Sequence, residues 1–179
     1  LSSTLDADSG SKYSVQREVK NVLVVAITSN RGLCGAFNSN IIKQTNTLIN
    51  DVYSDKNVSV LAIGKKANDA FAKQDRVIGN KSEVFDDLTF ENVAEIAEML
   101  MEKFVAGEFD KIELVYNSFK NAATQVIMSE QFLPIAPVEG DSNANLDYIF
   151  EPSKEEIVET LIPKSLKTQL FKGIRDSFA

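Results

Sequence analysis

Two glycines mark the one stretch of the chain whose residue types and spacing suggest phosphate binding. The segment Thr28–Gly35 (TSNRGLCG) follows an apolar run and contains Gly32 and Gly35. Glycines between a strand and a helix free backbone N–H groups to hold phosphate at the helix N-terminus. The match is incomplete, because a dinucleotide site needs Gly-x-Gly-x-x-Gly and a P-loop needs Gly-x-x-x-x-Gly-Lys-Ser/Thr. We therefore expect the glycines to form a tight turn and predict no cofactor-binding residue, with a nucleotide-binding module as the alternative.

Most other catalytic chemistry is excluded by composition. The chain has no histidine and one cysteine, Cys34, so an intramolecular disulfide, His- or Cys-rich metal sites and Ser-His-Asp or Cys-His catalysis are all ruled out. A thiol sensor is one interpretation of Cys34, because Arg31 and a helix N-terminus would favour the thiolate. A small buried packing residue is the favoured interpretation, since cysteine is among the most buried residue types.

The remaining candidates for chemistry are carboxylates and tyrosines. Glu91, Glu95, Glu98 and Glu102 recur at helical spacing opposite an apolar stripe, which is typical of a solvated helix face. The tyrosines form no recognisable constellation in the sequence: they are Tyr13, Tyr53, Tyr116 and Tyr148. We predict no catalytic or metal-binding residue, and hence no enzyme.

Charge is distributed unevenly along the chain. Ten acidic and three basic residues give Asn80–Glu113 a net charge of −7, equal to that of all 179 residues, whereas the segment after Leu161 is basic. An acidic body repels nucleic acid and anionic lipid, so neither is an expected partner. No apolar run approaches the roughly 20 residues that span a bilayer, so we expect no membrane insertion.

Alternating apolar runs and amphipathic stretches predict an α/β domain. Val22–Ile27 and Val58–Ile63 resemble strands buried on both faces, as in a parallel sheet, and a weak third strand is expected at Val77–Ile78. A helix follows each of the first two strands. The first has Phe37, Ile41, Leu48 and Val52 near helical spacing, and the second has Ala67, Ala70 and Phe71 facing inward.

The next helix and the strands after it complete the predicted sheet. Thr89 is the expected N-cap and Gly107 the expected C′ residue of a helix with one apolar stripe, formed by Phe90, Val93, Ala97, Leu100 and Phe104. Strands at Ile112–Tyr116 and Gln125–Phe132, joined by the polar residues 117–121, predict an edge hairpin. The expected fold is a Rossmann-like three-layer sandwich with a mainly parallel sheet.

The C-terminal segment predicts an amphipathic helix that is incomplete at Ala179. Ser153–Glu156 forms a capping box, and Pro163 is expected to kink or interrupt the pattern. The apolar stripe comprises Ile157, Val158, Leu161, Ile162, Leu166, Leu170, Phe171, Ile174 and Phe178. A continuous helix of about 26 residues would be ~39 Å long. One interpretation is a tail folded onto the sheet; the favoured one is a projecting helix whose apolar side meets another helix.

Several segments, in order, resemble the globular region of gamma subunits of bacterial-type F-type ATP synthases. The resemblance is carried by Arg17–Asn38, Gly107–Asp110, Val115–Phe119, Asp147–Ser153 and Leu161–Pro163. The family usually has Asp at position 30, where this chain has Asn30. Nothing in the chain resembles the N-terminal shaft helix of that family. We therefore expect a chain that folds but does not transmit torque by itself.

The resemblance implies a domain organisation and a mechanical role. It predicts a flexible segment at 1–16, an α/β domain at 17–150 and the start of a shaft helix at 151–179. The implied function is that of a non-catalytic central-stalk rotor subunit without cofactor, coupling rotation of the membrane ring to ATP synthesis. The implied partners are the alpha/beta hexamer, the epsilon subunit and the c-ring, at the cytoplasmic face of the inner membrane. A partner-binding adaptor domain is a further alternative.

Overall fold

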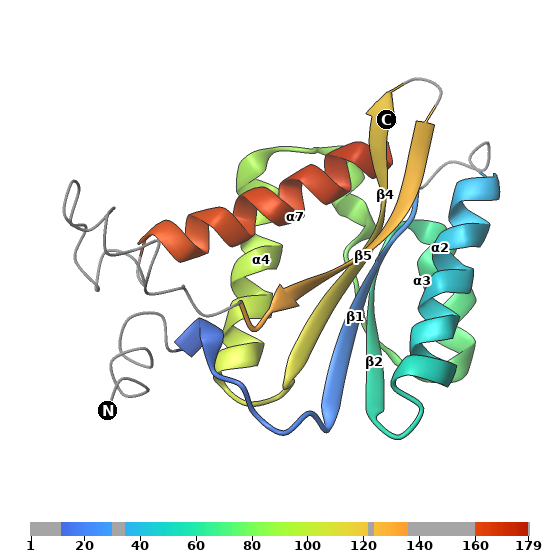
Figure 1. Cartoon of the computed structure of the whole chain (residues 1–179). Coiled ribbons are helices and arrows are strands. Elements are labelled where there is room, and N and C mark those ends of the chain that lie inside the picture. The colour runs from blue at the N-terminus through green and yellow to red at the C-terminus, as the bar shows by residue number, and fades with distance from the viewer. Residues whose placement is uncertain (1–11, 30–34, 122–123, 136–159, 179) are drawn as a thin grey trace.

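A five-stranded sheet in the order β3-β2-β1-β4-β5 forms the centre of the molecule (Figure 1). The computed structural model describes residues 12–29, 35–121, 124–135 and 160–178. The strands are β1 (Asn21–Ile27), β2 (Asn57–Ile63), β3 (Val77–Asn80), β4 (Lys111–Asn121) and β5 (Thr124–Leu133). All neighbours pair in parallel except β4 and β5, which pair antiparallel. The predicted parallel sheet with an edge hairpin is confirmed, but residues 117–121 extend β4 instead of forming the turn.

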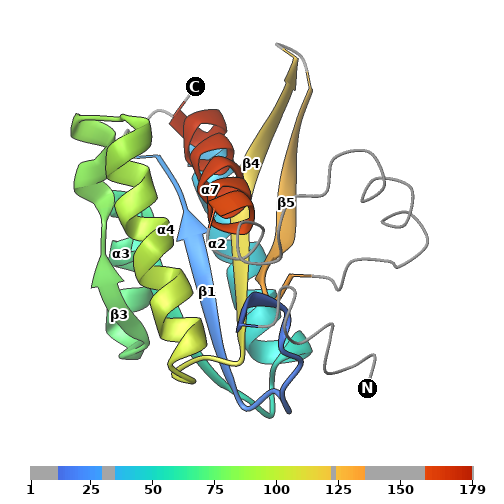
Figure 2. The ribbon, with the colours of Figure 1, turned by 90° about the vertical axis from the view of Figure 1, so that its left-hand side faces the viewer.

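Helices cover both faces of this sheet (Figures 1 and 2). One face carries α2 (Gly35–Thr47), its π-helical extension (Leu48–Val52) and α3 (Lys65–Phe71), whereas the other carries α4 (Phe90–Val105) and α7 (Ile162–Phe178). Two short 3-10 helices, Ala72–Gln74 and Ser82–Asp86, flank β3 in sequence. The mixed α/β class predicted from the sequence is therefore confirmed.

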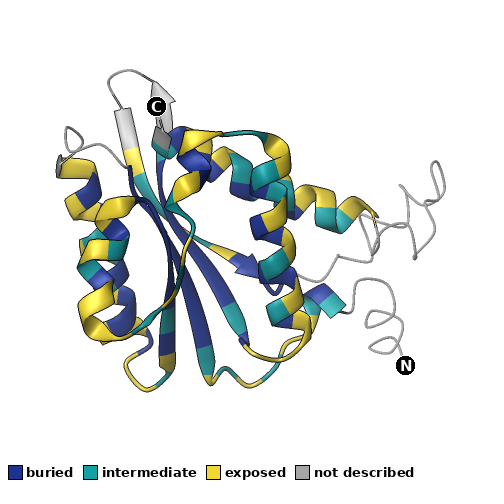
Figure 3. Cartoon of the chain, turned by 180° about the vertical axis from the view of Figure 1, so that it is seen from behind, coloured by how far each residue is buried: buried dark blue, intermediate teal, exposed yellow. Residues whose placement is uncertain are grey.

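The central strand β1 explains why both faces need a cover. Val22, Val24 and Ala26 belong to the core beneath α2 and α3, whereas Leu23, Val25 and Ile27 belong to the core beneath α4 and α7. All six side chains are fully buried, and the central strands are correspondingly dark in Figure 3. Side chains that alternate between two apolar cores account for the uninterrupted apolar run in the sequence.

The inward face of α2 differs from the prediction. Ile41 and Leu48 are buried as expected, but Phe37 and Val52 are exposed, and Val52 has 55% of its surface accessible. The buried positions continue instead through Thr45 and Ile49, one helical turn apart. The π-helical turn at Leu48–Val52 widens the helix and rotates Val52 away from the sheet.

Helix α4 begins and ends where the sequence predicts. Thr89 is its N-cap, and the Thr89 side chain accepts a hydrogen bond from the Asn92 backbone N–H at 3.1 Å. At the other end, the Gly107 N–H donates to Phe104 and the Glu108 N–H donates to Lys103, which are the two hydrogen bonds of a Schellman motif. The predicted apolar stripe is buried except for Phe90, which is partly exposed and lies against the ring of Phe171, with 5.7 Å between centroids.

Helix α7 lies beside α4 and packs on the sheet (Figure 2). Leu166, Leu170 and Ile174 are buried in the same core as α4, so the favoured interpretation of a projecting helix is wrong for residues 162–178. Pro163 lies in the first turn of α7, and residues 160–161 immediately before α7 are π-helical, so the helical pattern changes next to this proline, in line with the predicted interruption. The predicted capping box at Ser153–Glu156 lies outside the described residues.

The N-terminal boundary of the folded domain precedes the predicted one. Residues 12–14 form a helical turn, and Tyr13 is 7% exposed and packs in the α4–α7 core. The Tyr13 carbonyl accepts a hydrogen bond from the Ile135 N–H at 2.8 Å. Tyr13 is thus part of the domain, although the predicted flexible segment extends to residue 16.

An arginine–aspartate clamp joins two segments that are far apart in sequence. Asp110 accepts hydrogen bonds from Arg17 Nε at 3.1 Å and from the N–H groups of Lys20 and Asn21 at 3.0 Å each. The Arg17 guanidinium also donates to the carbonyls of Phe104 (2.9 Å) and Phe109 (2.6 Å). Burial raises the pKa of Asp110, but the Asn21 and Lys20 N–H groups and Arg17 outweigh it and hold that pKa below its ordinary value. The clamp fixes the start of β1 to the turn between α4 and β4.

The clamp predicts acid-sensitive stability. Because the pKa of Asp110 is lower in the folded chain, its contribution is fully present above the ordinary pKa of 3.8 and is lost as the pH falls through the lower folded value. We expect Asp110→Asn to lower the free energy of unfolding by about 1–3 kcal/mol at neutral pH. Urea unfolding of the unaltered chain and of Asp110→Asn should show that their difference in unfolding free energy shrinks well below pH 3.8. A difference that does not change with pH would contradict the lowered pKa of Asp110.

A second prediction concerns Gly64, which joins β2 to α3 with φ +116°. A Cβ at this position would lie 2.2 Å from the backbone oxygen of Thr28. We expect Gly64→Ala to destabilise the chain by about 3 kcal/mol or more, because strain and a backbone clash add. Gly107→Ala is the matched control: its φ is also positive (+85°) but nothing lies within 4 Å, so about 1–2 kcal/mol is expected. Equal losses in thermal or urea unfolding would show that the Thr28 contact is unimportant.

Candidate functional site

The carboxyl end of the parallel strands is the usual ligand site of a doubly wound sheet. Here two backbone N–H groups beside it, those of Ser29 and Ala67, bind the chain's own side chains. Thr28 follows β1 and its hydroxyl accepts a hydrogen bond from the Ala67 N–H, in the first turn of α3, at 3.0 Å. The Ser29 N–H donates to Asn38 Oδ1 at 3.0 Å. These donors are therefore engaged within the fold. The candidate residues Arg31, Gly32 and Cys34 lie outside the described residues, and Gly35 is the first residue of α2.

The carboxylates of α4 form the solvated face that the sequence predicts. Glu91, Glu95, Glu98 and Glu102 are all exposed. Glu98 pairs with Lys167 of α7, with 3.0 Å between Oε2 and Nζ. Among the described residues, no group of three or more His, Cys, Asp or Glu is placed to hold a metal ion.

The structure contains two hydrogen-bonded tyrosine–glutamate pairs that the sequence did not predict. The expectation that the tyrosines form no constellation is therefore wrong for Tyr53 and Tyr116. On the α2 face, Tyr53 donates a 2.5 Å hydrogen bond to the buried Glu113, which also accepts from Ser129. Burial and the Glu113 hydrogen bond raise the pKa of Tyr53. The sequence does carry a signal for this pair. Glu113 lies within the otherwise apolar strand Ile112–Tyr116, and a buried carboxylate requires hydrogen-bond donors. Tyr148 lies outside the described residues.

The second pair lies on the opposite face, beneath α7. The Tyr116 hydroxyl donates to Glu130 Oε2 at 3.0 Å, and Gln169 of α7 donates to Glu130 Oε1 at 2.8 Å. Burial and the Glu130 hydrogen bond raise the pKa of Tyr116, so the phenol stays protonated and serves as a donor. Both pairs connect separate elements and present no activated nucleophile.

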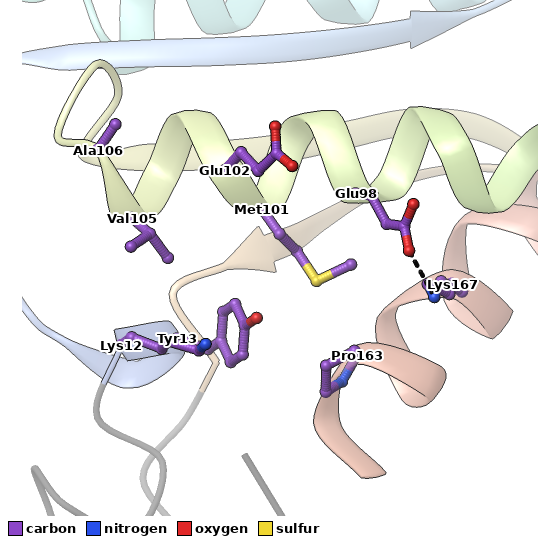
Figure 4. A pocket seen from close by; sticks show the side chains of 9 residues that line it. All are labelled: Lys12, Tyr13, Glu98, Met101, Glu102, Val105, Ala106, Pro163 and Lys167. Atoms are coloured by element: carbon purple, nitrogen blue, oxygen red, sulfur yellow. Dashed lines mark ion pairs between the residues drawn. The ribbon is translucent and has the colours of Figure 1, made fainter. Parts of the chain in front are cut away.

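Figure 4 shows a groove between α4, α7 and residues 12–14, which we call the α4–α7 groove. Its volume is about 520 Å³, and it is lined by Lys12, Tyr13, Glu98, Met101, Glu102, Val105, Ala106, Pro163 and Lys167. Tyr13, Met101, Val105 and Pro163 provide apolar surface, and charged side chains surround it. Val105 is 45% exposed. The described lining residues combine apolar surface with lysine and glutamate side chains, which suits contact by shape and charge.

Comparison with known sequences identifies the family. A sequence model described as ATP synthase matches residues 1–179. The chain is 66% identical over its whole length to the ATP synthase gamma chain of Flavobacterium psychrophilum and 64% identical to that of Flavobacterium johnsoniae. It spans 63% of the length of each of these relatives.

Solved structures agree with this assignment at the level of fold. The chain is similar to one in the central stalk/c-ring of the Tetrahymena thermophila mitochondrial ATP synthase, with a TM-score of 0.67 and 20% identity, covering 99% of this chain and 80% of that chain. A chain in the rotor of the Euglena gracilis mitochondrial ATP synthase gives a TM-score of 0.61 at 20% identity, with 96% and 68% covered. Because the family model matches the entire sequence, this chain belongs to the ATP synthase family.

Proposed function

We propose that this chain is the globular part of a non-catalytic rotor subunit of an F-type ATP synthase, coupling rotation of a membrane ring to ATP synthesis in other subunits. The observation that carries this proposal is the 66% identity, over every residue of the chain, to a protein named ATP synthase gamma chain. The rotor and central-stalk assemblies named for the structural relatives support the same role.

The packing of the domain supports a mechanical role. A coupler must be stiff, since a soft one would store work elastically instead of transmitting it. Both sheet faces are covered by close-packed helices, and such interiors have low compressibility and transmit strain. The Arg17–Asp110 clamp and the two tyrosine–glutamate pairs add directional hydrogen bonds between elements.

The proposal extends to domains, partners and location. Residues 151–179 are the proposed segment that leads into a shaft helix, and within it α7 packs on the sheet and would anchor that helix to the domain. The proposed partners are the alpha/beta hexamer, the epsilon subunit and the c-ring, at the cytoplasmic face of the inner membrane. In the part of the chain that the structure describes, no helix has both the length and the apolarity to cross a bilayer.

Rotation can be measured directly. We expect the full-length subunit to assemble with alpha and beta subunits and to turn when ATP is hydrolysed. A bead attached through Lys43→Cys, an exposed position on α2, in a Cys34→Ser background reports the motion in single complexes. Complexes without ATP serve as the control. Failure of the full-length subunit to assemble with alpha and beta would refute the proposal.

Nucleotide titration separates the rotor from a nucleotide-binding module. We expect ATP, ADP and NAD to leave the unfolding free energy of the chain unchanged, because the Ala67 and Ser29 N–H groups are already bound to Thr28 and Asn38. A nucleotide at 100 times its Kd would stabilise the chain by about 2.7 kcal/mol. Thermal unfolding with and without each nucleotide measures this, and a saturable shift would favour the nucleotide-binding alternative.

A further inference from the structure

Helix α7 comes very close to the sheet at Gly173. A Cβ at this position would lie 3.3 Å from Cγ of the Tyr116 ring, so the helix backbone rests almost directly on the ring. A glycine inside a helix costs up to about 1 kcal/mol relative to alanine. Its presence in the middle of α7 is therefore explained by the close approach to β4.

Glu130, on β5, connects the Gly173–Tyr116 contact to a second strand of the sheet. Its carboxylate is shared between the Tyr116 hydroxyl of β4 (3.0 Å) and the Gln169 amide of α7 (2.8 Å). The Gln169 amide also lies 3.4 Å from the backbone oxygen of Gln131. One partly buried side chain of β5 thus holds both the ring beneath α7 and the helix itself.

These hydrogen bonds differ in kind from most other contacts of α7, although the Asn117 N–H of β4 also donates to Ser177 Oγ of α7 over a longer 3.4 Å. Leu166, Leu170 and Ile174 bury apolar surface, which is non-directional and permits a helix to roll or slide. The Glu98–Lys167 ion pair is partly exposed, and such pairs contribute little. Hydrogen bonds require defined distances and angles, so the Tyr116–Glu130–Gln169 network is suited to fixing the rotation of α7 about its own axis.

We propose that Glu130 is a positioning residue that sets the orientation of α7 on the sheet and so transmits torque between the sheet and this helix. The torque part of this inference rests on the proposed rotor function. The positioning part does not, because it concerns only contacts within the described chain. The two parts are therefore tested separately.

The orientation of α7 can be measured by spin-label distances within the chain. Labels at Lys43→Cys on α2 and Lys172→Cys on α7, both exposed positions, report movement across the sheet in a Cys34→Ser background. We expect Glu130→Ala and Gln169→Leu each to shift and broaden the distance distribution. Glu130→Gln should restore it, because its amide can accept from Gln169 and donate to the Tyr116 oxygen.

Glu95→Ala is the matched control, since it removes the same charge from an exposed position on α4. Unchanged distributions in both Glu130→Ala and Gln169→Leu, or an equal change in Glu95→Ala, would overturn the positioning role. Gln169→Leu leaves the Tyr116–Glu130 pair intact, so it tests the helix contact even where Glu130→Ala unfolds the chain.

Torque is tested with the full-length subunit assembled in the complex, in membrane vesicles. We expect Glu130→Ala and Gln169→Leu to lower the ratio of proton uptake to ATP hydrolysis, and Glu130→Gln and Glu95→Ala to preserve it. An undiminished ratio together with altered spin-label distances would overturn the torque part alone. Absence of coupling with the unaltered subunit would refute the proposed function and leave the distance result standing.

Discussion

The fold depends on one constraint: a central strand that is apolar on both sides must be covered on both sides. β1 alternates its side chains between two cores, so neither face of the sheet tolerates water. One layer is supplied by α2 and α3, which lie close to β1 and β2 in sequence, whereas the other requires α4 and the distant α7. The need to cover this second face explains why the C-terminal helix packs on the sheet.

The sequence predicted the features that depend on local pattern. The strands Val22–Ile27 and Val58–Ile63, the cap at Thr89 and the helix end at Gly107 are each encoded by neighbouring residues. Features that depend on distant partners were missed, such as the Arg17–Asp110 clamp, whose members are 93 residues apart. The position of α7 was also beyond prediction, because an apolar stripe fits a partner helix and the chain's own sheet equally well.

Within the described residues, two backbone N–H groups at the ligand-binding edge of this fold are bound by the chain's own side chains. Thr28 and Asn38 accept hydrogen bonds from backbone donors of the kind that a phosphate would use in a nucleotide-binding relative of the fold. The same arrangement connects the β1 end to α2 and α3. An α/β sandwich can therefore serve as a rigid body as well as an enzyme scaffold, and the proposed rotor role uses it in the first way.

The position of β1 also determines how the domain responds to a pulling force. β1 is hydrogen-bonded to parallel neighbours on both sides, and the Arg17–Asp110 clamp lies at its N-terminal end. Tension applied along the strand from that end would load both ladders at once, in shear, and could not open them one bond at a time. A strand held in this way should yield only at high force, whereas the edge strands β3 and β5 each have a single neighbour and a single ladder to break.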